Sequence, residues 1–174
     1  RWGATLLPDG FTLDWYLKLW GDPRFLAAFG RSLLVCFATL LLGTLVLVPT
    51  VLVVAYYFPK LDPWMNLLIL LPFAVPPVVS SVGLLQIYAD GPLPIIGTPW
   101  ILIGTWFTVV LPFMYRALAN SLQGVPLKDL MDAAHLLGAS SRRAFLLVVI
   151  PCLRKGLLAA LFLSLSFLLG EFVF

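Results

Sequence analysis

Charged residues are what this sequence has least of. Of its 174 residues, 11% are Asp, Glu, Lys or Arg, whereas a soluble globular domain carries about 25%. Apolar residues make up 61% of the chain, and the mean hydropathy is +1.04. So few charges cannot cover the surface of a soluble domain, and so apolar a composition excludes a disordered chain. The composition therefore predicts an integral membrane protein.

Histidine, cysteine and phosphate-binding motifs are scarce or missing as well. His135 is the single histidine, which excludes a metal site built from two histidines. Cys36 and Cys152 lie far apart and do not form the pattern of a disulfide framework. The sequence Gly-x-x-x-x-Gly-Lys-Ser/Thr does not occur, so we expect no ATP site and no cofactor on this chain. The net charge of +3 is too small to indicate a nucleic-acid partner, and the apolar runs offer too few polar groups for an enzyme active site.

Long uncharged runs are what the sequence has instead. They extend over 32–59, 63–89 and 91–115, and a further run extends over 156–170. A helix of about 20 apolar residues crosses the hydrocarbon core of a bilayer. The sequence therefore predicts an all-α bundle of transmembrane helices in contact with lipid, over 32–58, 63–88, 97–121 and 154–174. Because the chain opens without Met and closes inside an apolar run, we expect it to be a fragment, with the last helix truncated.

The distribution of basic residues predicts the orientation of these helices. Loops on the cytoplasmic side of a membrane protein are enriched in Lys and Arg. One side of the predicted bundle receives Lys60, Arg116, Lys128, Arg142, Arg143, Arg154 and Lys155. The other side receives Arg1, Lys18, Arg24 and Arg31. The long loop between 116 and 155 is therefore predicted to be cytoplasmic, and residues 1–31 periplasmic.

Residues 1–31 differ from the rest of the chain. Thr12 and the pair Asp22-Pro23 are typical of helix starts, and aromatic residues lie between and after them. We expect an outer loop with two short helices at the membrane interface. A partly ordered loop is the alternative.

The second and fourth predicted spans contain residues that could line a pathway. Pro76 and Pro77 remove backbone donors, and Ser80 and Ser81 follow them. Such a span is either a kinked helix that lines a translocation route or a packed kink whose hydroxyls bond to their own backbone. Glu171 is the one acid in the last run, so it is either a pathway or gating group or a paired structural carboxylate.

The last span also carries small residues at four-residue spacing. They are Gly156, Ala160 and Ser164. Small side chains allow two membrane helices to approach closely. This stripe predicts a packing face.

The segment 124–152 is predicted to be a helix, a glycine turn and a second helix. Apolar residues recur there at spacings of three and four, namely Leu127, Leu130, Met131, Ala134 and Leu137. Gly138 ends this amphipathic helix, Ser140 or Ser141 starts the next, and Pro151 ends that one. Such a unit offers an apolar surface on which a partner protein can dock.

This segment resembles the EAA motif of permease subunits in binding-protein-dependent ABC importers. The family pattern is Glu-Ala-Ala, three residues, Gly, nine residues, then Ile, any residue, Leu and Pro. Here Asp132-Ala133-Ala134, Gly138 and Val148-Val149-Ile150-Pro151 stand at the same spacing. The departures are Asp132 for Glu, Val148 for Ile and Ile150 for Leu. Gly170-Glu171-Phe172 is also similar to a feature of the span that follows the motif in several subfamilies.

The resemblance implies a MetI-like permease core of six spans, with the EAA loop between the fourth and fifth. This chain would then hold the second to fifth spans within one permease domain, and 1–31 would follow the first span. The resemblance also implies that a separate ATPase subunit binds ATP and docks on the loop. The residues implied in this coupling are Asp132, Ala133, Ala134, His135, Gly138, Ile150 and Pro151.

Further partners and the substrate are implied by the same resemblance. They are a second permease chain, identical or different, and a periplasmic substrate-binding protein, all at the bacterial inner membrane. The chain is similar to permeases for polyamines, phosphonates, iron or thiamine, and a phosphonate such as 2-aminoethylphosphonate is the leading expectation. A secondary carrier or channel without an ATPase is the alternative, because prolines within spans suit it equally well.

Overall fold

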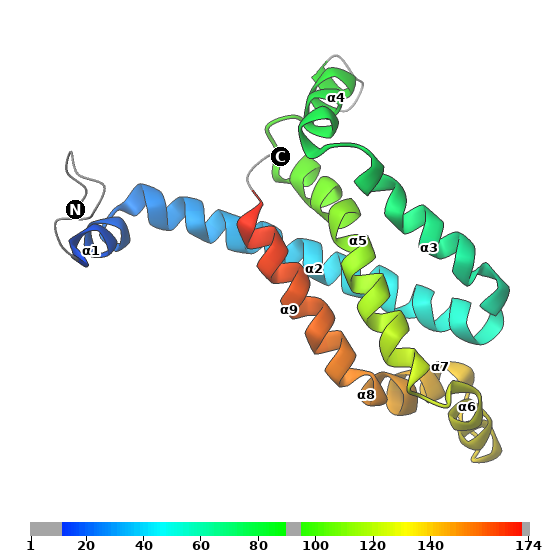
Figure 1. The fold of residues 1–174 in the computed structure, drawn as a ribbon. Helices are drawn as coiled ribbons and strands as arrows, with labels where there is room; N and C mark the ends of the chain where they lie inside the picture. The colour runs from blue at the N-terminus through cyan, green and yellow to red at the C-terminus, as the bar shows by residue number, and fades with distance from the viewer. Residues whose placement is uncertain (1–11, 90–94, 172–174) are drawn as a thin grey trace. The chain divides into compact units, whose positions relative to one another are not determined.

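The computed structural model describes residues 12–89 and 95–171, and every element in these ranges is helical (Figure 1). This confirms the predicted all-α class. By length and composition, α2 (Pro23–Tyr57) and α5 (Pro99–Gln123) could each cross a membrane. Two bent pairs of helical segments also pass this test, each taken as one span.

The first bent pair covers the second predicted span, and the second follows the predicted loop. In the first, η1 (Pro59–Leu61), α3 (Asp62–Leu70) and η2 (Leu71–Ala74) join α4 (Pro77–Ala89) at 85°. In the second, α7 (Ser141–Ala144), η3 (Phe145–Val149) and α8 (Ile150–Cys152) join α9 (Arg154–Gly170) at 70°. Each bent pair is a broken span or a re-entrant segment.

The first bent pair corrects the prediction of one Pro-kinked helix over 63–88. Val75 is extended, with φ −105° and ψ 125°, and interrupts the helix completely. The residue before a proline is pushed out of the α region by the proline ring, and Pro76 and Pro77 supply no backbone N–H. Two consecutive prolines therefore break this segment where a single one would bend it.

The chain divides into two units, 1–34 and 35–174. In the first unit, α1 (Asp14–Trp20) follows Thr12, whose Oγ1 accepts a hydrogen bond from the N–H of Asp14 at 3.2 Å. Asp22 Oδ1 accepts one from the N–H of Arg24 at 2.8 Å and so caps α2. The separate second short helix predicted for 1–31 is wrong, because α2 begins at Pro23 and continues to Tyr57. No proline lies between Pro23 and Pro49 to stop it.

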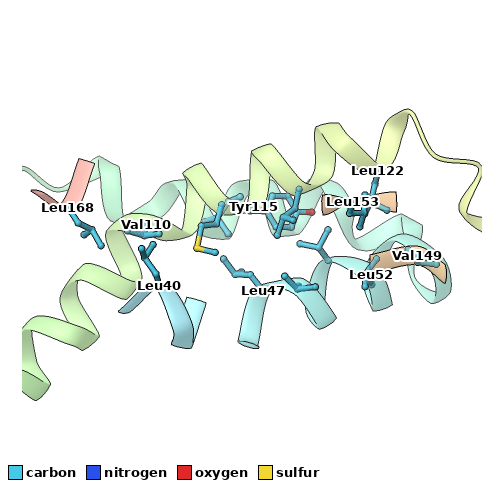
Figure 2. Close-up of a cluster of buried hydrophobic side chains, with 14 of the residues drawn as sticks. Leu40, Leu47, Leu52, Val110, Tyr115, Leu122, Val149, Leu153 and Leu168 are labelled. Atoms are coloured by element: carbon cyan, nitrogen blue, oxygen red, sulfur yellow. The ribbon is translucent and has the colours of Figure 1, made fainter. Parts of the chain in front are cut away.

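The core of the second unit lies between α2, α5 and the second bent pair. Figure 2 shows side chains from these elements pointing toward one another. They include Leu40, Leu47, Leu52, Val110, Tyr115, Leu122, Val149, Leu153 and Leu168. Burial of this apolar surface ties the predicted loop to the long helices.

The closest helix contact is between α5 and α9, which run side by side (Figure 1). A Cβ added to Gly156 would lie 1.7 Å from Oγ of Ser121 and 2.4 Å from its Cβ. Ala160 and Ser164 are completely buried on the same stripe. The predicted packing role of the small residues is confirmed.

A polar contact joins α3 to α5. The hydroxyl of Tyr115, which is 1% exposed, donates a hydrogen bond to Oδ1 of Asp62 at 2.5 Å. The side-chain amide of Asn66 donates to Oδ2 of Asp62 at 3.1 Å. The first bent pair is therefore fastened to α5 at its start.

Candidate coupling loop and cavity

The predicted coupling helix is α6 (Leu127–Leu136), and its inner face belongs to the core. It begins after Pro126, whose carbonyl accepts a hydrogen bond from the N–H of Leu130 at 3.1 Å. Met131 is fully buried and Ala134 is 6% exposed. Both side chains pack in the same cluster as the residues of α2 and α5. The amphipathic pattern of the sequence thus holds α6 against the bundle.

Gly138 ends α6 in a left-handed conformation, with φ +81°. The N–H of Ala139 bonds to the carbonyl of Ala134 at 3.0 Å, and that of Gly138 to the carbonyl of His135 at 2.9 Å. This pair of bonds is the Schellman cap, which places glycine at the residue with positive φ. The cap gives a physical reason for the spacing between the second alanine of the motif and its glycine.

The outer face of α6 carries the other residues of the motif. Asp132, Ala133 and His135 are exposed, and Nε2 of His135 lies 3.2 Å from Oγ of Ser141. Leu136 and Leu137 are 90% and 89% exposed. The fold therefore divides the motif: Asp132, Ala133 and His135 are exposed, and Ala134 is buried.

Leu136 was not identified from the sequence, whereas Leu137 was grouped with Met131 and Ala134 on one apolar surface for docking a partner. The structure divides this group, because Met131 and Ala134 are buried in the core and Leu137 is 89% exposed, so the prediction of a docking surface is wrong for Met131 and Ala134. The helix ends before Leu137, so helical spacing no longer sets its direction. The sequence did contain a signal for an exposed leucine, namely the pair Leu136-Leu137 directly before the capping glycine. Two adjacent residues of a helix point in different directions, so both cannot face the protein core.

The second half of the loop packs on the end of α2. The Phe145 ring lies 5.9 Å from that of Tyr56 and 6.5 Å from that of Tyr57, centroid to centroid. Val149 is fully buried, Ile150 is half-buried and Pro151 is exposed.

The helix of this half continues past Pro151 to Cys152, so the prediction that Pro151 ends it is wrong by one residue. Pro151 follows η3 without a break, so it lies inside a continuous helical segment to which it cannot donate a backbone hydrogen bond. The segment η3 just before it is a π-helix. A π-helical turn is wider than an α-helical turn. It therefore leaves room for the ring of Pro151, which in an α-helix would clash with the carbonyl of the residue four positions earlier.

A cavity of about 720 Å³ lies between α4, α5 and the end of α9. Of the predicted pathway residues, Pro77, Ser80 and Glu171 line it. Pro76 and Ser81 are not among the lining residues, and the Ser81 hydroxyl donates to the carbonyl of Val78 at 2.9 Å. The fold thus brings three of the five residues to one cavity, and the two most distant of them, Pro77 and Glu171, are 94 positions apart in the sequence.

Three phenylalanine rings in contact with one another contribute to the lining of this cavity and of a second one. The Phe113 ring lies 5.7 Å from that of Phe73 and 4.9 Å from that of Phe167, centroid to centroid. Phe73 and Phe167 line the first cavity, and Phe73 and Phe113 line the second, of about 350 Å³, together with Arg116. Sequence reasoning missed this cluster of rings, because the three phenylalanines come from three different elements and no regular spacing in the sequence relates them. In 12–89 and 95–171, no three His, Cys, Asp or Glu side chains gather as metal ligands.

Comparison with known proteins identifies the family. The model of the binding-protein-dependent transport system inner membrane component matches residues 47–174, well over half of the chain. These residues include the coupling loop and every residue that lines the two cavities. The chain belongs to this family of inner-membrane transport components.

Relatives in the family carry names for different solutes. The chain is 31% identical over 171 residues to PhnV of Salmonella typhimurium, named as a 2-aminoethylphosphonate transport system permease protein, covering 98% of this chain and 63% of that protein. It is 31% identical over 161 residues to cysT of Prototheca wickerhamii, named for sulfate, covering 87% and 63%. It is 28% identical over 188 residues to PotB of Escherichia coli, named for spermidine and putrescine, covering 97% and 66%. The chain thus spans less than two thirds of the length of these relatives.

Proposed function

We propose that this chain forms part of the substrate pathway of an ABC importer in the inner membrane and couples it to a separate ATPase subunit through the outer face of α6. The observation that carries the proposal is the exposure of Leu136 and Leu137, at 90% and 89%. Two adjacent leucines with exposed side chains are typical of a protein-binding surface. The buried Met131 and Ala134 fix the helix that presents them.

The neighbouring polar residues suit the same docking surface. Asp132 and Ala133 are exposed on α6, one turn before the leucines. The carboxylate of Asp132 can pair with a basic group of the ATPase, and Ala133 is small enough for close approach. An apolar centre with a charged group beside it is the usual anatomy of such an interface.

The fold offers a physical route from this surface to the bundle. Movement of α6 is carried by Met131 into the core, and by Phe145 to Tyr56 at the end of α2. Val149 and Leu153 join the same cluster as Leu122 of α5. Because a packed core moves as a body, closure of two ATPase subunits on bound ATP would shift these helices together.

The partners in this proposal follow from the family. A binding-protein-dependent component works with a substrate-binding protein, and we propose a periplasmic one, with a second permease chain completing the pathway. ATP would bind the ATPase subunit and not this chain. The family supports the importer over a carrier or channel, which has no need of a capped docking helix.

For the substrate, we propose a small organic solute such as 2-aminoethylphosphonate or a polyamine. The names of PhnV and PotB support these two classes. The name of cysT adds sulfate as a candidate. Iron and thiamine, which the motif resemblance also implied, have no support among these three relatives.

The docking surface is tested by the double substitution Leu136→Ser with Leu137→Ser. It is made in the full-length permease, assembled with its ATPase and binding protein in proteoliposomes. Each leucine contributes about 1.5–3 kcal/mol when buried in an interface, so we expect substrate-stimulated ATP hydrolysis to fall at least about tenfold. Membrane insertion should be unchanged, because neither side chain contributes to the core.

Lys128→Ser is the matched control. Lys128 is exposed on the first turn of the same helix, away from the two leucines, and its loss should change hydrolysis less than twofold. Cysteine at Ala133 should also crosslink to the ATPase subunit. Normal hydrolysis in the double leucine variant, with no crosslink from Ala133, would refute the docking role.

A further inference from the structure

We infer that the second cavity, of about 350 Å³, binds a tetrahedral oxyanion group through Arg116 and Asn120 of α5. Phosphonate, sulfate and phosphate are groups of this class. The group belongs either to the transported solute or to the headgroup of an anionic lipid, and a competition experiment distinguishes these two sources. For a solute, the inference rests on the proposed function and assigns a chemical class to its substrate.

Arg116 is the charged residue of this cavity. It lies within α5, about two turns before the helix ends at Gln123. Among the described residues that line the cavity, none is Asp or Glu, and all except Arg116 and Asn120 have apolar side chains. A charged side chain within a membrane helix is costly unless a group of opposite charge pairs with it. An anionic ligand supplies such a group.

The polar atoms of Arg116 and Asn120 are available to a ligand. Both side chains are exposed, and neither forms a hydrogen bond or an ion pair in the part of the chain that the structure describes. Asp62 is the acid that α5 contacts through Tyr115. It accepts hydrogen bonds from Tyr115 and Asn66 and is not among the lining residues of the cavity.

The placement of the two side chains suits an oxyanion. They stand at positions i and i+4 of α5, so they lie on the same face of the helix, one turn apart. A guanidinium group has only donors, and its planar fork matches a pair of oxygens on a phosphonate or sulfate group. The side-chain N–H groups of Asn120 add further donors. An ammonium group would meet a like charge at Arg116.

The rest of the lining strengthens the attraction for an anion. Phe73, Phe113 and Leu163 are among these apolar residues. The attraction between a guanidinium and an oxyanion is stronger beside such side chains than in water. Phe73 also lines the first cavity, so an oxyanion bound here lies next to it. The cavity therefore favours 2-aminoethylphosphonate or sulfate over a polyamine, which has no oxyanion group.

The charge preference of the cavity is measured at a cysteine in place of Leu163, which lines the cavity from α9. Leu163→Cys is made in the full-length permease of the assembled importer, with Cys36→Ala and Cys152→Ser removing the native thiols. The importer is purified in dodecyl maltoside, a detergent without phosphate. Two methanethiosulfonate reagents are compared, one with an ethylsulfonate group, itself an oxyanion, and one with an ethylammonium group. Each rate is divided by the rate of the same reagent with a free thiol in solution.

We expect the sulfonate reagent to react at Leu163→Cys at least about tenfold faster than the ammonium reagent. Arg116→Gln should remove most of this preference, and Arg116→Lys, which retains the positive charge, should keep most of it. The matched control is Gln86→Cys, because Gln86 is exposed on α4 and lines neither cavity. Its reagent preference should not change with Arg116→Gln.

Competition identifies the source of the oxyanion. If a solute occupies the site, 2-aminoethylphosphonate, sulfate or inorganic phosphate above its dissociation constant should slow the reaction at Leu163→Cys at least about twofold, and putrescine should not. Protection by phosphatidylglycerol added to the detergent, without protection by the soluble ions, assigns the site to a lipid headgroup.

Several results would overturn the inference. They are equal rates of the two reagents at Leu163→Cys, a faster ammonium reagent, a preference that survives Arg116→Gln, or no protection by any oxyanion or by the lipid. If Arg116→Gln does not assemble, the preference and the protection measured with Arg116 intact still decide. Failure of the proposed function is a separate outcome, namely solute uptake by the unmodified importer that does not depend on ATP.

Discussion

The two bent pairs of helical segments have similar angles, 85° and 70°, and very different surroundings. In the first pair, Ile69 is the buried residue of α3, and α4 buries none of its side chains. The second pair has buried residues at intervals along its whole length, namely Ala144, Val149, Leu153, Ala160, Ser164 and Leu168. One pair is therefore a loosely held wall of the cavity, and the other is a part of the core.

The difference shows that bends of similar angle in two membrane segments can be held in place in different ways. Around Leu153, buried side chains on both sides, such as Val149 and Ala160, hold the angle between α8 and α9. Around Val75 the side chains are exposed, so packing does not fix the angle between α3 and α4. That angle depends on the prolines and on a few contacts, such as the one between Tyr115 and Asp62. Regions with few buried contacts are the ones that open and shift most readily. Three kinds of substitution, at glycine, tyrosine and proline, distinguish the two bent pairs.

The largest effect is expected from the same change made in both pairs, glycine to alanine. In α9, Gly156→Ala should lower the free energy of unfolding by about 1–3 kcal/mol, because its Cβ would overlap Ser121. In α4, Gly83→Ala should raise it by up to about 1 kcal/mol, because alanine favours the helix and no atom lies within 4 Å of the added Cβ. Thermal unfolding of the purified importer measures both.

A second substitution checks the cause of the Gly156 effect. Ser121→Gly removes the two atoms that the new Cβ would meet. It should restore part of the stability of Gly156→Ala, although a glycine in α5 itself costs about 1 kcal/mol. Equal and small effects at Gly156 and Gly83 would contradict the contrast between the two pairs.

Tyr115→Phe should have an intermediate effect. It removes the hydrogen bond that fastens the start of α3 to α5, and a neutral donor to a carboxylate that water can also reach contributes about 1 kcal/mol. We expect faster amide hydrogen exchange in the first bent pair and unchanged exchange in the second. Loss of protection in α9 instead would show that this contact belongs to the core.

The smallest effect on stability is expected from proline to alanine at each bend, about 0.5 kcal/mol. Pro76→Ala releases Val75 from its extended conformation, so the 85° bend should become variable. Pro151→Ala should leave the 70° bend unchanged, because Val149 and Leu153 are buried on either side of it.

Spin-label distances between exposed residues measure both bends. Labels at Leu67 and Ile87 report on the first, and labels at Leu147 and Phe162 on the second. A distance distribution that broadens in the second pair and stays narrow in the first would reverse the comparison.

Parts of the fold and of the coupling loop were predictable where a local rule applies. The spacing of the apolar residues predicted that α6 is an amphipathic helix, Gly138 predicted its end, and Gly156 predicted the close packing of α9. Each depends on residues within a turn or two. The burial of Met131 and Ala134 in the core, the complete break at Val75 and the joining of Pro23 to the long helix were not predicted. These features depend on where a helix ends and on what packs against it. Several local preferences compete over the position of a helix end, so no single sequence rule predicts it.

The sequence by itself determined that this chain is helical and lies in a membrane, and that it carries an amphipathic helix ended by a glycine between two apolar segments. These properties follow from composition, helical periodicity and the conformational freedom of one glycine, all of which act over short distances. The tertiary structure alone decided which residues of the motif face outward and which of the prolines, serines and acids share a cavity. Residues as distant as Pro77 and Glu171 meet only when helices pack, because packing complementarity between side chains, and not the pattern within either segment, sets that contact.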